Sequence, residues 1–227
     1  MQDLSQNYAD PAIAGRQRRT VTRELAEMYK GKVRGYYALA GRVINQIKEK
    51  EPEWESATLL DIACGSAYYS EVLEFLCPGW IDYVGMDYNS GMVELAHKCY
   101  PDIRVEQGNI LEIPFERDSF DIVLSSATIG HVKDWLKAVQ ELVRVTRTWL
   151  ILHRNPVWLD ENKLTKQIVR CDYEVNVVVT QFRERDLIDG VTSLGMVLMG
   201  VYGMGEWGIP GTSTYLFKKG VRASDDL

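Results

Sequence analysis

Short apolar runs alternate with helical patterns along the middle of the chain, and this alternation constrains the fold more than any other feature. The runs typical of buried strands cover 58–62, 81–86, 103–107, 120–125 and 149–153, and the helical patterns cover 68–76, 90–99 and 134–147. Strands joined by helices lie parallel, because right-handed crossovers leave little other choice. We therefore predict an α/β fold with a mostly parallel sheet and helices on both of its faces.

The C-terminal part departs from this alternation. A helical pattern over 184–194 leads to two strand-like runs at 196–202 and 212–217, which a segment rich in Gly and Pro separates. These runs can pair as an antiparallel hairpin, which brings the sheet to seven strands. Before this part lies an insertion, residues 156–182, whose stretch at 174–180 is β-prone. Long insertions beside a site often form its lid.

The N-terminal part is predicted to be a helical extension. Apolar residues recur there at helical spacing, so an amphipathic helix should run to about Lys50 before Pro52 breaks it; they are Val33, Tyr37, Ala40, Ile44 and Ile47. We assign residues 1–55 to this cap and residues 56–227 to one α/β domain, because no repeat or linker interrupts the chain. The basic cluster of Arg16, Arg18 and Arg19 is interpreted as a solvated N-terminal arm.

Composition excludes several classes of protein. With 46% hydrophobic and 26% charged residues, the chain needs neither disorder nor a disulfide scaffold to explain it. Its net charge of −6 disfavours a nucleic-acid substrate, because such proteins usually present a basic surface to the phosphates. No apolar run approaches the ~20 residues that span a bilayer, and the N-terminus lacks the apolar core of a signal peptide. We therefore expect a cytoplasmic protein without membrane insertion.

Cysteine and histidine spacing indicates neither a disulfide framework nor a metal site. The four cysteines have no CxxC pairing and are expected to be reduced thiols; they are Cys64, Cys77, Cys99 and Cys171. No group of His and carboxylate residues shows ligand spacing, so no metal is expected.

The segment LLDIACGSAYYSEVL, residues 59–73, is the most informative for function. A strand ends near Asp61, small residues follow over 63–67, and a helix begins. In an α/β sheet such a turn lets a ligand touch the backbone at the carboxyl edge, although close packing alone can also select small residues. Asp87 ends the next strand 22 residues after Gly65, and an acid about 20 residues beyond such a turn typically holds a ribose diol.

These motifs resemble those of the class I S-adenosylmethionine-dependent methyltransferases, in particular the small-molecule branch that includes the ubiquinone and menaquinone biosynthesis enzymes. DIACGSA resembles the first motif of that family and YVGMD the second. GNILEIPF, residues 108–115, is similar to the segment that frames adenine, and DSFDIVLSSATIGHV followed by ELVRV is similar to the fourth strand and the next helix. The resemblance covers about 59–153 and implies a Rossmann-like fold.

The resemblance also implies roles for individual residues. Asp61, Ala63 and Gly65 would face the methionine part of the donor S-adenosylmethionine, and Asp87 would bind its ribose. Asn109 and Ile110 would border the adenine, and Ser125 would lie beneath the sulfonium. The implied reaction moves a methyl group to an oxygen, nitrogen or carbon of a small molecule and leaves S-adenosylhomocysteine. The sequence leaves the acceptor and the oligomeric state open.

Departures from the family pattern keep two alternatives open. Ala63 and Ala67 stand at positions where the family usually has glycine, Asn109 replaces an acid, and ELVRV continues into TRTWL in place of a proline and glycine turn. A nicotinamide dinucleotide would use the same sheet edge in an oxidoreductase, but it normally requires GxGxxG, where this chain has Ala63, Gly65 and Tyr68. The other alternative is a non-catalytic subunit that binds the donor in support of a partner.

Candidate acceptor residues cluster after the fourth and fifth predicted strands. His131 and His153 are candidate catalytic bases, with capping or loop hydrogen bonding as the other interpretation of His131. Arg154 and Asn155 extend the same edge and could bind a polar acceptor. Aromatic residues that could line the pocket, with core packing as their alternative role, are Tyr36, Tyr37, Trp158 and Trp207.

Overall fold

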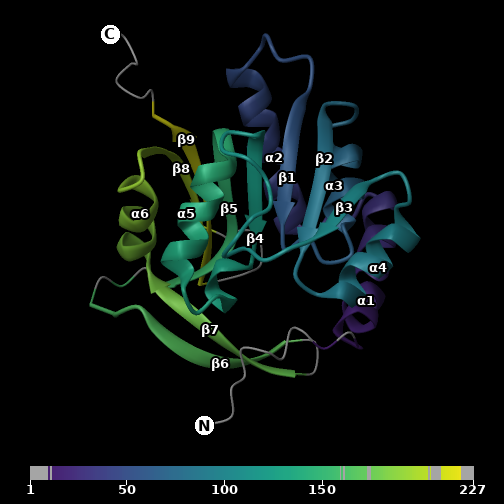
Figure 1. The fold of residues 1–227 in the computed structure, drawn as a ribbon. Coiled ribbons are helices and arrows are strands. Elements are labelled where there is room, and N and C mark those ends of the chain that lie inside the picture. The colour runs from purple at the N-terminus through teal and green to yellow at the C-terminus, as the bar shows by residue number, and fades with distance from the viewer. Residues whose placement is uncertain are drawn as a thin grey trace.

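The structure is a computed structural model that describes residues 10, 12–158, 160, 162–172, 175–203, 205 and 211–220. A central sheet carries helices on both faces (Figure 1). Its first five strands all run parallel in the spatial order β3-β2-β1-β4-β5; they are β1 (Ala57–Ile62), β2 (Ile81–Asp87), β3 (Arg104–Gln107), β4 (Phe120–Ser126) and β5 (Thr146–Trp158). The predicted Rossmann-like architecture is confirmed.

An antiparallel hairpin completes the sheet, as the sequence predicts. Strand β9 (Thr212–Lys219) pairs antiparallel with β5, and β8 (Met196–Gly203) pairs antiparallel with β9. The parallel strands end at one edge of the sheet, so the residues that follow β1, β2 and β4 meet there. This carboxyl edge positions the candidate site.

Two layers of helices cover the sheet. Helices α1 (Ala12–Tyr29), α2 (Gly35–Lys50), α3 (Tyr68–Leu76) and α4 (Ser90–Cys99) pack on one face, and α5 (Trp135–Val145) and α6 (Glu184–Thr192) pack on the other. Along β1 and β4 the buried side chains alternate between the layers: Leu59 and Ile122 contact the first, Leu60 and Val123 the second. Strands buried on both faces read as continuous apolar runs, which is why they could be predicted.

The insertion forms a long hairpin, and its first residues differ from the prediction. Strand β5 continues to Trp158, so 156–158 belong to the sheet. The hairpin consists of β6 (Lys166–Asp172) and β7 (Val175–Arg183), and its end joins β5 through Val157 and Phe182. It therefore adds two strands to the predicted seven. In Figure 1 the hairpin crosses below the carboxyl edge of the sheet.

The basic cluster lies on a helix, and the prediction of a solvated N-terminal arm is wrong for Arg18, which is bound to the domain, whereas Arg19 is exposed. Arg16, Arg18 and Arg19 lie within helix α1, which packs beside α4 (Figure 1). The Arg18 Nη1 donates to Tyr100 Oη (2.9 Å), and its guanidinium lies 5.3 Å from the Tyr100 ring centroid. Apolar residues at helical spacing, including Val21, Leu25 and Met28, bury one side of this helix in the core.

Helix α5 is shorter than predicted. It ends at Val145, and β5 begins at Thr146 without an intervening loop. The Thr146 hydroxyl donates to the Leu142 carbonyl (2.7 Å) and satisfies one of the helix's last acceptors. This direct junction explains how the chain does without the proline and glycine turn of the resembling family.

The structure also bears on the membrane-spanning helices and the cysteine thiols considered in the sequence. No helix in the described residues combines the length and apolar character needed to cross a membrane. Cys64, Cys77 and Cys99 are free thiols.

Candidate donor and acceptor site

The donor-side loop connects β1 to α3. Ala63, Gly65 and Ala67 all adopt left-handed backbone conformations, each with a φ of 58°. Glycine adopts this conformation without steric cost, whereas a non-glycine residue there stores about 1–3 kcal/mol of strain, which persists only where the surrounding structure holds it. The two alanines thus keep the alternating backbone shape that the resembling family builds with glycines.

Asp87 at the end of β2 binds this loop directly. The Gly65 N–H donates to Asp87 Oδ2 (2.8 Å), and the Asn89 N–H donates to Asp87 Oδ1 (2.9 Å). The side chain is buried, and burial raises the pKa of Asp87. A carboxylate offers about four acceptor positions, so it can accept a further hydrogen bond beside those from the backbone.

Asp61 is a second buried acid at the same edge. The Tyr83 hydroxyl donates to Asp61 Oδ2 (2.6 Å). Burial raises the pKa of Asp61 to about 7, the hydrogen bond from Tyr83 opposes that shift, and the charge of Asp87 adds to it. Two buried carboxyl groups at one edge form a local environment that favours a cation.

Two residues complete the loop, and the sequence indicated neither role. A Cβ atom at Gly85 would lie 2.9 Å from Cys64 Sγ, so β2 needs a glycine where the loop packs on it. Gln17 reaches the loop from α1, and its Oε1 accepts from the Ser66 N–H (3.1 Å). Helical spacing could reveal that α1 exists, but no local signal tells which segment that helix covers.

The segment expected to frame adenine follows β3. Asn109 is exposed, and its Oδ1 accepts from the Leu111 N–H (2.9 Å), so the turn already uses the oxygen considered for adenine. Ile110 is half-buried and packs against the core below α5. Neither observation tests the predicted adenine contact, and it stays a prediction.

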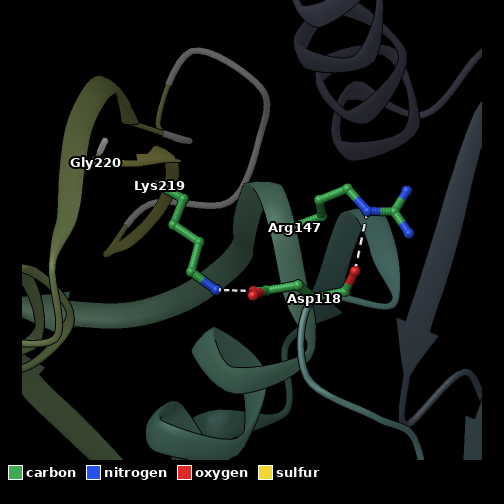
Figure 2. Close-up of a pocket in the computed structure, with 4 residues that line it drawn as sticks. All are labelled: Asp118, Arg147, Lys219 and Gly220. Atoms are coloured by element: carbon green, nitrogen blue, oxygen red, sulfur yellow. Dashed lines mark hydrogen bonds and ion pairs between the residues drawn. The ribbon is translucent and has the colours of Figure 1, made fainter. Parts of the chain in front are cut away.

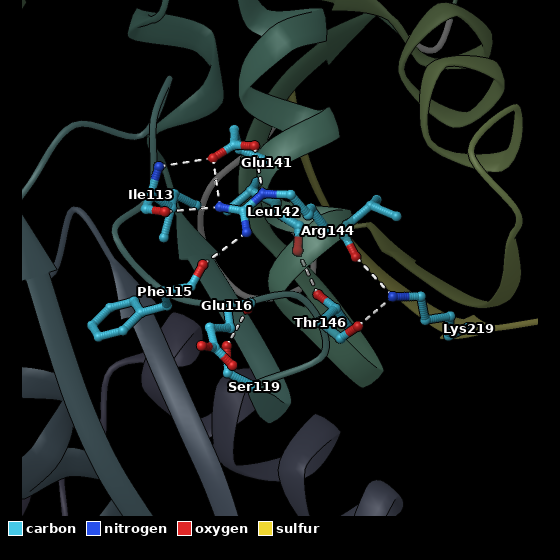
Figure 3. Close-up of polar contacts among 10 residues, drawn as sticks. Ile113, Phe115, Glu116, Ser119, Glu141, Leu142, Arg144, Thr146 and Lys219 are labelled. Atoms are coloured by element: carbon cyan, nitrogen blue, oxygen red, sulfur yellow. Dashed lines mark hydrogen bonds and ion pairs between the residues drawn. The ribbon is translucent and has the colours of Figure 1, made fainter.

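Two residues of the ELVRV motif hold this segment against α5. Arg144 donates to the Phe115 carbonyl (2.7 Å), to the Ile113 carbonyl (2.8 Å) and to both carboxylate oxygens of Glu141 (Figure 3). Glu141 Oε2 in turn accepts from the Ile113 N–H (2.8 Å). We call these two side chains the Glu141–Arg144 clamp. Arg144 lowers the pKa of Glu141, which keeps the clamp charged.

The clamp leads to a stability prediction. Arg144→Ala should lower the free energy of unfolding by about 2–3 kcal/mol, because it leaves two backbone carbonyls and a carboxylate without their shared donor. Chemical denaturation measures this loss. Arg185→Ala is the matched control, since its exposed ion pair with Asp189 (3.4 Å) should contribute less than about 1 kcal/mol. Equal losses in the two variants would contradict the role of the clamp.

His153 lies at the carboxyl edge beside Ser126 of β4, with which it is paired in the sheet. The side chain is fully buried, its Nδ1 lies 2.8 Å from Thr214 Oγ1, and its Nε2 has no hydrogen-bond partner among the described residues. Burial, assisted by the charge of Arg154 and opposed by a backbone hydrogen bond with Tyr36, lowers the pKa of His153 to about 3. The imidazole is therefore neutral near pH 7 and suits hydrogen bonding better than proton removal.

Arg154 brings β5 and α2 together. Its φ of 59° is left-handed, at the point where the pairing of β5 with β9 shifts register. The guanidinium lies 4.3 Å from the Tyr36 ring centroid, and the Tyr36 and Tyr37 rings make an edge contact at 4.6 Å. The Tyr37 hydroxyl donates to the buried Glu24 (3.1 Å). The structure thus joins three of the predicted acceptor residues.

The other predicted acceptor residues are less closely connected. Asn155 is fully buried, and neither atom of its amide has a hydrogen-bond partner among the described residues. Trp158 lies at the base of the hairpin, with Lys166 Nζ 5.4 Å from its ring centroid. Trp207 lies outside the described residues.

His131 ends the short helix η2 (Ile129–His131) after β4 and is half-buried. The hairpin packs directly on this helix: a Cβ atom at Gly130 would lie 3.1 Å from the Thr180 carbonyl oxygen. Ser125, paired with Ile62 of β1, is fully buried, and its hydroxyl has no partner among the described residues. His131, Ser125 and the donor-side loop therefore share the carboxyl edge.

The opposite edge of the sheet carries a hollow of about 250 Å³, lined by Asp118, Arg147, Lys219 and Gly220 (Figure 2). Its charges neutralise one another: Lys219 pairs with Asp118, Arg147 Nε donates to the Asp118 carbonyl (3.0 Å), and Arg147 pairs with Asp121. No predicted site residue lies there. This hollow is a structural junction at the amino ends of the strands, where α/β folds rarely bind ligands.

Comparison with known proteins shows what the central part of the chain resembles. The methyltransferase-domain family matches residues 60–149, which include the donor-side loop, Asp87 and the Glu141–Arg144 clamp. The match identifies a methyltransferase domain over these residues, which make up about two fifths of the chain.

One sequence relative and two solved structures show how far the similarity extends. Demethylmenaquinone methyltransferase of Bacillus velezensis is 31% identical over 98 residues, which cover 41% of this chain and 42% of that protein, so the similarity spans about two fifths of the relative. DesVI of Streptomyces venezuelae shares the fold with a TM-score of 0.63 at 17% identity, over 88% of this chain and 98% of that one. An amino pentose methyltransferase of Micromonospora echinaspora, solved with bound S-adenosylmethionine, has a TM-score of 0.62 at 16% identity, over 86% and 96% of the chains.

Proposed function

We propose that the protein transfers the methyl group of S-adenosylmethionine to a small-molecule acceptor held at the carboxyl edge of its sheet. The observation that carries this proposal is the donor-side loop, with three left-handed residues between two buried acids on adjacent strands. Residues 1–55 would act as a cap on the α/β domain of residues 56–227, since α1 and α2 pack on the same face of the sheet as α3 and α4.

The residues at this edge fit the proposed donor. S-adenosylmethionine carries a sulfonium and an ammonium, and the buried carboxylates of Asp61 and Asp87 would attract positive charge. The Asp87 carboxylate would also accept hydrogen bonds from the ribose hydroxyls. The donor supplies an electrophilic methyl group, and the chain has to align the acceptor with it and exclude water.

The hairpin and the aromatic residues would perform that alignment. Since β7 packs on η2, the hairpin would cover the acceptor next to His131. Tyr36 and Tyr37 would form an apolar wall, Arg154 would bind a polar or acidic group, and Trp158 would extend the wall toward the hairpin. His131 would take a proton from an oxygen acceptor, and neutral His153 and Asn155 would orient the acceptor by hydrogen bonds.

A ligand-binding prediction separates this function from the oxidoreductase alternative. S-adenosylhomocysteine at about 100 times its Kd should stabilise the protein by about 2.7 kcal/mol, because it binds only the folded state. For a chain of this size that corresponds to a rise of about 5–10 °C in the thermal midpoint. The measurement is thermal unfolding with S-adenosylmethionine, S-adenosylhomocysteine or NADH. A shift with NADH and none with the other two would replace the proposal by the oxidoreductase.

Binding alone does not separate an enzyme from a donor-binding subunit. Incubation with labelled donor and a metabolite extract, followed by mass analysis, identifies any acceptor. Demethylmenaquinone is the first pure compound to test, because the sequence relatives are named for it. Donor binding without transfer in either experiment would support the non-catalytic alternative.

A further inference from the structure

We propose that Gln17 of helix α1 is a donor-binding residue that receives the carboxylate of the donor's amino-acid end. The inference rests on the proposed function and adds a residue from outside the family match, which begins at residue 60. It makes α1 a wall of the donor site in addition to a packing element of the core.

The position of the Gln17 amide is the first argument. Its Oε1 accepts from the Ser66 N–H (3.1 Å), which determines the orientation of the amide. A Cβ atom at Gly65 would lie 2.5 Å from Gln17 Nε2, so this nitrogen sits directly in front of the loop's central glycine. The side chain is more than nine-tenths buried, and Nε2 makes no hydrogen bond to any described residue. The amide thus presents a donor group to whatever lies against Gly65.

Charge is the second argument. Asp61 and Asp87 attract the cationic groups of an amino-acid ligand, but they repel its carboxylate. The carboxylate therefore needs hydrogen-bond donors of its own at the loop. The Gln17 Nε2 is such a donor, and the hydroxyl of Ser66, fully buried and without a partner among the described residues, is another. An uncharged amide binds an anion without the cost of burying a further ion.

The attachment of α1 is the third argument, because a ligand-binding side chain has to be held in place. On one side of Gln17, Ile13 and Ala14 pack on Met92 of α4. On the other side, Arg18 donates to Tyr100 Oη (2.9 Å), and the Tyr100 hydroxyl donates to Glu71 of α3 (2.6 Å). Helix α1 is thus joined to the two helices that follow β1 and β2, the strands that carry the acids.

Two ligands separate this role from a merely structural one. S-adenosylhomocysteine has the amino-acid chain, whereas 5′-methylthioadenosine keeps the adenosine and the sulfur but lacks that chain. Gln17→Ala should weaken S-adenosylhomocysteine about tenfold, which corresponds to about 1.4 kcal/mol, and leave methylthioadenosine within about twofold. Gln17→Glu keeps the acceptor oxygen and puts an anion in place of Nε2, so it should weaken S-adenosylhomocysteine more than alanine does. Isothermal titration of the unmodified full chain and of both variants with each ligand measures these affinities.

Arg23→Ala, an exposed change on the same helix, is the control and should alter neither affinity. Equal weakening of both ligands by Gln17→Ala would overturn the proposal in favour of a structural role. Tighter binding of S-adenosylhomocysteine would also overturn it, because Gln17 would then block the loop. If the unmodified protein binds neither ligand, the proposed function itself fails, which is a distinct result.

Discussion

His131→Ala should reduce kcat by about a hundredfold or more while leaving the affinity for S-adenosylhomocysteine almost unchanged. The reason is its position on η2, which follows β4 at the carboxyl edge and contacts the β6–β7 hairpin, where a base would act on an oxygen acceptor in the transition state only. Steady-state rates with an identified acceptor and titration with S-adenosylhomocysteine measure the two effects.

Two further variants define what His131 does. Gln at this position keeps a hydrogen-bonding group but cannot accept a proton as imidazole does, so His131→Gln should restore the acceptor KM without restoring kcat. His97→Ala, on α4 with its Nε2 2.9 Å from the Val105 carbonyl, is the histidine control and should keep kcat. Normal kcat and KM in a folded His131→Ala protein would exclude both the catalytic and the orienting role.

The pH dependence of the rate provides a separate check. An ordinary imidazole titrates near pH 6.5, so a histidine base implies a rate that falls as the solution becomes acidic. His153 cannot account for such a fall, because burial lowers its pKa to about 3 and it stays neutral above that pH. If the acid limb persists unchanged in His131→Ala, another group is responsible for it.

Asp87→Ala should weaken S-adenosylhomocysteine by about 2–4 kcal/mol, or roughly 30-fold to 1,000-fold, because two charge-assisted hydrogen bonds to the ribose are lost. The structure adds a second consequence. Since the Gly65 and Asn89 N–H groups both donate to this carboxylate, the variant should also lose stability. Isothermal titration measures the first effect, and chemical denaturation measures the second.

The Asp87 experiment needs a variant that preserves the loop. Asp87→Asn keeps the volume and one acceptor oxygen, so it should fold better than the alanine variant and still bind the donor weakly. Asp82→Ala, an exposed acid on the same strand, controls for the change in net charge and should bind normally. Full affinity in folded Asp87→Asn would show that the ribose is held elsewhere.

Local sequence predicted only part of the candidate site. Asp61, Gly65 and Asp87 could be placed together because strand ends of a parallel sheet meet at one edge, and the structure does bring Gly65 and Asp87 into contact. The lowered pKa of His153 could not be predicted from the sequence. His131 follows β4 and His153 lies within the neighbouring strand β5, but full burial and the nearby charge of Arg154 set His153 apart.

The sequence by itself determined the order and type of the elements of the central domain. Strands β1, β2 and β4 and helices α3 and α4 lie within one residue of their predicted limits. These elements are encoded locally. Apolar periodicity, and the small and polar residues that begin and end each element, act over a few neighbouring positions. The predicted boundary between α5 and β5 was wrong, because the helix there passes into the strand without a loop.

Only the tertiary structure decided which distant segments complete the site. Gln17 meets Ser66 across 49 residues, His153 meets Thr214 across 61, and Arg154 reaches the Tyr36 ring from β5. The insertion is likewise β-prone in sequence, but its packing on η2 depends on contacts with Gly130. Such contacts depend on burial, charge and shape accumulated over the whole fold. No local window of residues contains that information, because each half of the contact is compatible with many partners until the sheet and its helices have packed.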